Sequence, residues 1–333
     1  MQPAPETAAS GDTLACPLCG TADPVPLWEL GDRLFHTTAR RFTLRRCTAC
    51  SLRFLAPPPQ PAELASFYPE GYWLDSPEAH GRSLGRNRLV ELYRRLVLFD
   101  HVRFVRTIVS EQQRRGAWRG LLDVGCGDGS FLGALGVTPA VGLDRSPSAC
   151  LAVRTRGISA LRGDLGDTPL AERSFSIVTM FHYLEHVSPT APSLEAAQRL
   201  LAPGGRLVVQ VPNAASWQAC LLGRYWAGYD PPRHLIDYTP KTLRTTLARH
   251  GFEIVRVTFF SVRDNPTALA NSLAPGLYPP ARVALGRHGA WQEWLANLCY
   301  LALVWLGLPF TLIESAFGHG AAVMVEARPS DRT

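Results

Sequence analysis

One stretch, residues 121–132, constrains the fold of this chain more than any other. Its sequence is LLDVGCGDGSFL: an apolar run ends in Asp123, glycine occupies alternate positions from Gly125 to Gly129, and a second apolar run begins. Glycine has no Cβ atom, so the backbone can turn sharply here and a ligand can lie against it. The stretch predicts a strand, a tight loop and a helix, which is how an α/β nucleotide-binding fold begins.

A second apolar run, residues 140–143, ends in Asp144, 21 residues after Asp123. Folds that bind dinucleotides place a ribose-binding carboxylate at about this distance. Their phosphate-binding fingerprint, however, needs its third glycine three residues after the second. Here Gly129 follows Gly127 by only two residues. The spacing therefore argues against an NAD-binding domain.

Four further motifs follow in order along the chain. They are Gly163-Asp164-Leu165, the run 175–181, His182-Tyr-Leu-Glu-His186 and the run 200–212, which contains Pro-Gly-Gly. Together with the glycine loop they resemble the class I S-adenosylmethionine (SAM)-dependent methyltransferases; one difference is Ser176, where that family usually has Asp. The resemblance implies a Rossmann-like, seven-stranded, mostly parallel sheet with helices on both faces and an antiparallel last strand.

The resemblance also implies which residues would bind SAM. Asp144 matches the ribose-binding acid of the family, and Asp164 with Leu165 matches the segment that faces the adenine. The predicted cofactor-binding residues are Asp123, Gly125, Gly127, Asp144, Arg145, Asp164, Leu165 and Phe181.

Two Cys-x-x-Cys pairs near the N-terminus have the spacing of a metal site. Cys16 and Cys19 are separated by 27 residues from Cys47 and Cys50. Each pair can direct two thiolates at one tetrahedral ion, and four thiolates form a closed structural site that favours Zn²⁺. Redox chemistry, the alternative, would need only one pair. We therefore predict a structural zinc ribbon.

A zinc ribbon before a methyltransferase core is similar to two groups: bacterial sugar and natural-product methyltransferases, and ribosomal RNA guanine methyltransferases. Tyr68 and Tyr72 resemble the tyrosine pair in the linker of the first group, where such residues lie over the cofactor or acceptor. Packing between two domains is the alternative reading of this pair, and the sequence favours neither.

The length of 333 residues, 46% of them hydrophobic, allows one large domain and a small one. The expected division is a disordered tail (1–13), a zinc-ribbon segment (14–56), a linker (57–85), the methyltransferase core (86–262), an apolar helical insertion or lid (263–319) and the last core strand (320–329). The polar tail holds no signal sequence, so a cytoplasmic location is expected.

The insertion contains an uncharged apolar run, residues 294–313. Its length would suffice to cross a bilayer, but the chain must return to the same sheet and 264–290 offers no second span. We expect a helical element that is buried against the core or serves as a lid, broken at Gly307 and Pro309. Peripheral membrane contact through 294–313 is the alternative.

Methyl transfer to a hydroxyl or carbon acid requires a base, and histidine suits this task near neutral pH. Three candidates are His182, His186 and His234, of which His234 is preferred because it lies in the loop expected to cover the acceptor. Arg233 is a candidate anchor for an acceptor phosphate or carboxylate. Alternatively, Arg233 and His234 only join this loop to the core.

The leading hypothesis is SAM-dependent methylation of a small-molecule or glycan-type acceptor, such as a nucleotide- or lipid-linked sugar. The first alternative is an RNA methyltransferase that binds nucleic acid through its ribbon, which the net charge of +6 and a group of basic residues allow. The second is a non-catalytic scaffold of the same fold. The basic residues near the ribbon are Arg40, Arg41, Arg45, Arg46 and Arg53.

Overall fold

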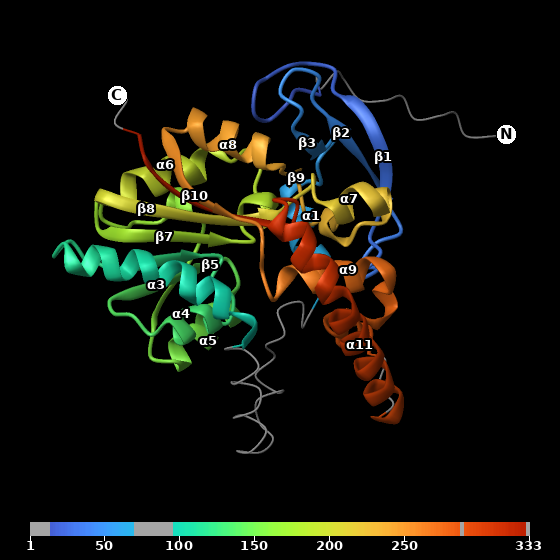
Figure 1. The fold of residues 1–333 in the computed structure, drawn as a ribbon. Coiled ribbons are helices and arrows are strands. Elements are labelled where there is room, and N and C mark those ends of the chain that lie inside the picture. Colours follow the sequence, from blue (N-terminus) through green and yellow to red (C-terminus); the bar gives the residue numbers. More distant parts are fainter. Residues whose placement is uncertain (1–13, 70–95, 287–289, 331–333) are drawn as a thin grey trace.

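The computed structural model describes residues 14–69, 96–286 and 290–330. The predicted tail 1–13, the candidate Tyr72 and most of the predicted linker lie outside these ranges. Figure 1 shows the arrangement of the elements, with the ribbon segment above and beside a central sheet.

A seven-stranded sheet forms the core, in the order β10-β11-β8-β7-β4-β5-β6. Strands β4 to β8 are parallel to one another, and β11 runs antiparallel to both of its neighbours. This is the predicted fold class, and the expected antiparallel pairing of the last two strands is confirmed. The strands are β4 (Leu121–Val124), β5 (Ala140–Asp144), β6 (Ser159–Arg162), β7 (Phe175–Phe181), β8 (Leu201–Pro212), β10 (Phe252–Thr258) and β11 (Ala322–Pro329).

Helices cover both faces of this sheet, as Figure 1 shows. On one face lie α3 (Phe99–Arg114), α4 (Ser130–Leu135) and α5 (Pro147–Thr155); on the other lie α6 (Ala191–Leu200) and α8 (Pro240–Arg249). The start of α8 follows from its local sequence: the Thr239 hydroxyl caps the helix by accepting from the Thr242 amide, and Pro240 follows at the first turn. Because both faces are covered, the central strands β4 and β7 are buried along almost their whole length.

A second, four-stranded sheet has the order β1-β2-β3-β9. Strands β1 (Val25–Gly31), β2 (Arg41–Arg46) and β3 (Arg53–Leu55) belong to the ribbon segment. The fourth strand, β9 (Ile236–Asp237), comes from the loop after β8 of the core. The ribbon segment is thus not self-contained, because the core supplies one of its strands.

The insertion consists of α9 (Asp264–Leu273), α10 (Pro279–Ala284) and α11 (Ala290–Ala316). The predicted break at Gly307 and Pro309 is wrong, since α11 continues through both. A Cβ atom at Gly307 would lie 2.9 Å from a Leu269 methyl group, so glycine here permits close packing of α11 on α9. The remaining short elements are α1 (Pro61–Leu64), α7 (Trp217–Leu222) and the 3₁₀ turns Ala65–Phe67, Leu165–Asp167, Leu184–His186, Gly223–Tyr225, Ala227–Tyr229 and Pro275–Leu277.

Candidate functional sites

The five parallel strands end at the same edge of the sheet, which we call the carboxyl edge. Here the glycine loop follows β4 and Asp144 ends β5. The Asp144 carboxylate accepts hydrogen bonds from the amides of Gly127 (3.1 Å) and Ser146 (2.8 Å). Gly127 has φ +53°, and no atom lies within 4 Å of the position its Cβ would occupy. The loop therefore has free space on one side. A ligand that lies against the loop would need this space.

Asp123 is buried within the sheet rather than exposed at its carboxyl edge. Only 3% of the residue is exposed, and its carboxylate accepts from the Thr179 hydroxyl at 2.6 Å on the neighbouring strand. Burial raises the pKa of Asp123 to about 7. Burial also raises the pKa of Asp144, although the amide hydrogen bonds oppose that shift. Asp123 thus joins β4 to β7, while the Asp144 carboxylate holds the amides of the glycine loop and of Ser146.

The other predicted cofactor residues fall on the same edge. Arg145 and Asp164 form an ion pair that joins the ends of β5 and β6. Leu165 is fully buried in the core. Phe181 ends β7 and packs edge-to-face on Phe131, with ring centroids 4.8 Å apart.

Two of the candidate bases lie side by side. The rings of His186 and His234 have centroids 4.7 Å apart at a steep angle, and ligand-type atoms of Glu185, His186 and His234 all lie within 4.8 Å of one another. The hydroxyl of Tyr68 is 3.0 Å from His186 Nδ1. The structure thus brings together two predicted histidines and a predicted tyrosine from distant parts of the chain.

Backbone carbonyl groups fix the tautomers of both imidazoles. His186 Nδ1 lies 3.0 Å from the Arg233 carbonyl, and His234 Nδ1 lies 2.8 Å from the Gly228 carbonyl. A carbonyl only accepts, so each Nδ1 carries the proton and each Nε2 keeps a lone pair. Burial, together with the neighbouring His234, lowers the pKa of His186 to about 4. His186 is therefore neutral at neutral pH and is a weak base.

His182 has a different environment. It lies between Glu185 (3.0 Å) and Asp264 (3.3 Å), in the left-handed backbone region at φ +51°. Burial alone would lower its pKa, but the two carboxylates outweigh burial and raise it to about 9. A histidine that is protonated at neutral pH cannot act as the base. The sequence does not reveal this, because Asp264 comes from the insertion, far along the chain.

Arg233 does not have the free guanidinium that an acceptor anchor requires. It is fully buried, and it donates to both oxygens of Asp32 (2.7 and 3.1 Å), both oxygens of Asp230 (2.5 and 2.8 Å) and the Phe67 carbonyl (3.0 Å). These five bonds use all five N–H groups of the guanidinium. The prediction of an anchor is corrected: Arg233 has a structural role, and it joins its loop to the ribbon segment and the linker rather than to the core.

The ribbon segment also holds the loop that carries His234. The Leu55 amide donates to the Leu235 carbonyl (3.0 Å), and the Leu235 amide donates to the Glu185 carbonyl (2.8 Å). His234 is thus placed between a strand of the ribbon and the turn after β7. Its position depends on contacts from both sheets.

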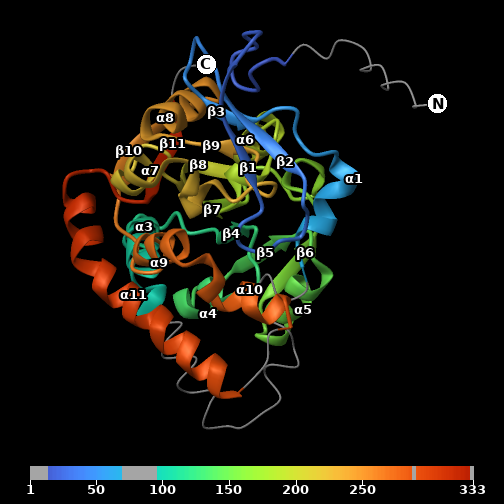
Figure 2. The same ribbon diagram turned by 90° about the vertical axis from the view of Figure 1, so that its right-hand side faces the viewer.

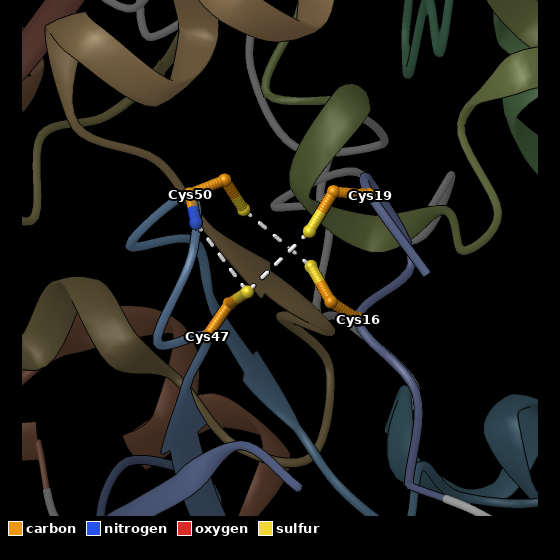
Figure 3. Close-up of side chains that lie close together, drawn as sticks. All are labelled: Cys16, Cys19, Cys47 and Cys50. Carbon is orange, nitrogen blue, oxygen red and sulfur yellow. Dashed lines mark hydrogen bonds between the residues drawn. The ribbon is translucent and has the colours of Figure 1, made fainter. Parts of the chain in front are cut away.

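The four N-terminal cysteines converge, as Figure 3 shows. One ligand atom from each lies within 4.8 Å of the others, with sulfur atoms 3.6 Å (Cys16 to Cys50) and 3.4 Å (Cys19 to Cys47) apart. The two pairs fold alike: the Cys16 amide donates to the Thr21 carbonyl and the Cys47 amide to the Leu52 carbonyl, each at 2.9 Å. These two matching turns aim four sulfur atoms at one point. The donor set fits a tetrahedral Zn²⁺ ion.

Residues 90–257 match a protein-family model described as a methyltransferase domain. Among curated proteins, an uncharacterized protein of Mycobacterium tuberculosis is 33% identical over 135 residues, which cover 40% of this chain and 47% of that protein. A Mycolicibacterium smegmatis protein named "Probable S-adenosylmethionine-dependent methyltransferase" is 29% identical over 147 residues, covering 42% and 54%. The chain thus spans about half the length of these curated relatives.

Solved structures with a similar fold include a SAM-dependent methyltransferase from Archaeoglobus fulgidus. It is 20% identical with a TM-score of 0.41, and the match covers 67% of this chain and 93% of that one.

Proposed function

Because this chain belongs to the methyltransferase-domain family that half of its residues match, we propose that it transfers the methyl group of SAM to a small-molecule or glycan-type acceptor. One observation carries the proposal: the glycine loop braced by Asp144 and the histidine pair of His186 and His234 belong to the same carboxyl edge of the sheet. Open α/β sheets bind their ligands at this edge.

The residues at this edge suit SAM. The Asp144 carboxylate would accept from the ribose hydroxyls, beside the open face of Gly127, and the Arg145–Asp164 pair would border the adenine. When bound, SAM supplies an electrophilic methyl group on a sulfonium that leaves readily. The chain must then position the acceptor and remove its proton.

His234 is our candidate for the base. Its Nδ1 proton is held by the Gly228 carbonyl, so Nε2 can take the acceptor's proton. His186 stays neutral beside it, and burial raises the pKa of Tyr68, so that its hydroxyl stays protonated and can donate to an acceptor oxygen. Glu185 is buried and its pKa is lowered by His182, so a carboxylate faces the imidazolium as it forms.

The surroundings of this cluster favour a small or glycan-type acceptor over RNA. His234 is only 8% exposed, which suits a group that enters a narrow site. The arginines near the ribbon, which make RNA binding conceivable from the sequence, are largely engaged within the protein. Four of the five donate hydrogen bonds to groups of this chain: Arg40, Arg41, Arg45 and Arg53.

The acceptor class is tested by incubating the protein with labelled SAM and extract of the source cells, and then separating RNA, protein, lipid, glycan and small molecules. We expect label in the glycan, lipid or small-molecule fraction. Label confined to RNA would replace the proposal with the RNA alternative. Intact SAM binding without label in any fraction would favour the scaffold alternative.

Asp144→Ala should weaken SAM binding about a hundredfold while the protein still folds, because two charge-assisted hydrogen bonds to the ribose are lost. Isothermal titration with SAM measures this. Asp167→Ala, at a carboxylate one turn beyond Asp164, is the matched control and should bind as the wild type does. Unchanged affinity of the Asp144 variant would remove the ribose assignment.

We also propose that Cys16, Cys19, Cys47 and Cys50 hold a structural zinc ion. The strands of the ribbon segment are short, so they provide little structure of their own. A closed thiolate site would hold the two cysteine turns together. Since β3 pairs with β9, zinc would also stabilise the loop that carries His234.

Purified protein is expected to contain one zinc ion per chain by elemental analysis. Cys47→Ser should lose the metal and most of the activity, and limited proteolysis should then cut within 14–56. Cys220→Ser, at an exposed cysteine outside the cluster, is the control that should retain metal and activity. A metal-free wild type with full activity would disprove a structural zinc.

A further inference from the structure

The apolar helix α11 is not buried, contrary to the expectation of burial against the core. Only 17% of its most apolar window lies inside the structure, and Figures 1 and 2 show the helix at the margin of the molecule. Trp291, Trp294 and Trp305 are each more than two-thirds exposed. The other large apolar side chains exposed on α11 are Leu295, Leu298, Leu301, Leu306, Leu312 and Ile313.

These side chains form one continuous strip. At 100° per residue they occupy about two-fifths of the helix circumference, and the exposed polar residues Asn297 and Gln292 lie just outside its two margins. The opposite side, including Tyr300, Gly307 and Thr311, is buried. The helix has 27 residues and is about 40 Å long, and the strip from Trp291 to Ile313 covers about 34 Å of it.

Among the described residues, α11 is the one helix long and apolar enough to cross a bilayer. Its packing argues against a crossing. The Tyr300 hydroxyl donates to Asn271 of α9 at 2.9 Å, and the chain rejoins the core sheet at Ala322, six residues after the helix ends. A helix that is fixed to α9 from Tyr300 to Ser315 can lie on a bilayer but cannot pass through it.

The shape of the strip favours a lipid surface over a second copy of this chain. Two helices that pack on each other bury a seam of about two residues in seven, which would leave much of this strip in water. A bilayer covers a strip of any width. Tryptophan is enriched where proteins enter the membrane interface, and the net charge of +6 attracts anionic lipid headgroups.

We propose that α11 docks this protein on an anionic membrane surface, with its apolar strip in the interface and its opposite side on α9. The helix lies in the plane of the membrane and does not span it. This docking goes beyond the proposed function, since it needs neither SAM nor an acceptor. If both hold, a lipid-linked acceptor is favoured among the acceptors proposed above.

Flotation of the full chain with vesicles tests the docking, using phosphatidylcholine alone and phosphatidylcholine with phosphatidylglycerol. The wild type should float with the mixed vesicles and less well with the neutral ones. The variant W294Q/W305Q/L306Q should bind the mixed vesicles about a thousandfold more weakly, because moving each of its three large apolar side chains out of water changes the equilibrium roughly tenfold. Its substitutions are all exposed, so its thermal unfolding should match that of the wild type.

The control variant L151Q/V255T replaces exposed apolar side chains outside the insertion and should float like the wild type. Three results would overturn the proposal. These are a wild type that floats with neither vesicle, a triple variant that binds as well as the wild type, and a wild-type dimer by light scattering that the triple variant abolishes without any vesicle binding in either protein.

Discussion

Replacing Arg233 with methionine is expected to lower the free energy of unfolding by about 3–5 kcal/mol, the usual cost of breaking a buried ion pair from one side. Asp32 and Asp230 would stay buried, and each would lose its only charged hydrogen-bond donor among the contacts described above. Methionine is similar in length, so little cavity forms and the loss reports the uncompensated carboxylates. Urea unfolding followed by circular dichroism measures it.

The matched control is Arg199→Met, at an exposed arginine of α6, which should change stability by less than about 0.5 kcal/mol. A triple variant that also carries Asp32→Asn and Asp230→Asn should recover part of the loss, because no buried charge is then left unpaired. Equal stability of Arg233→Met and wild type would show that the five hydrogen bonds contribute nothing.

The Arg233 contact also predicts a dependence on pH. Burial alone would raise the pKa of Asp32, but Arg233 outweighs burial and lowers it from 3.8 to about 2. A carboxyl group with a depressed folded-state pKa stabilises the fold above its unfolded pKa. This contribution is lost as the pH falls from about 4 to about 2, and it should be absent from Arg233→Met. Acid titrations of the two proteins should therefore converge at low pH.

His234→Asn is expected to lower kcat roughly 10²–10⁴-fold, the range that general-base catalysis contributes. The asparagine amide can still donate to the Gly228 carbonyl, so the loop keeps its contact, but no nitrogen remains that can take a proton. SAM affinity should be unchanged, since Asp144 and the glycine loop are untouched. Steady-state methyl transfer with the acceptor found by fractionation, together with SAM titration, separates the two effects.

His36→Asn provides the matched control. His36 is exposed and lies at φ +53°, a conformation that asparagine tolerates well. Its kcat should equal that of the wild type. If His234→Asn keeps full activity, the base assignment fails, and His186 becomes the next nitrogen to test.

The sequence predicts those parts of this protein that depend on neighbouring residues in the chain. The glycine loop, the carboxylate at Asp144, the cap of α8 and the cysteine pairs are short motifs whose geometry follows from local backbone chemistry. The motif order also predicts the seven-stranded sheet. All of these features appear in the structure at the expected residues.

Only the tertiary structure decides which distant groups meet. The sequence suggests that Arg233 anchors a ligand. In the structure its guanidinium is bound by Asp32, which is 201 residues away in the chain. His182 looks like His186 in one motif, but Asp264 keeps it charged. The apolar run in α11 is compatible with a buried helix and with an exposed one, so the sequence pattern does not distinguish the two. The periodicity of a sequence indicates which face of a helix or strand a side chain lies on. Which group that side chain contacts depends on how the whole chain packs.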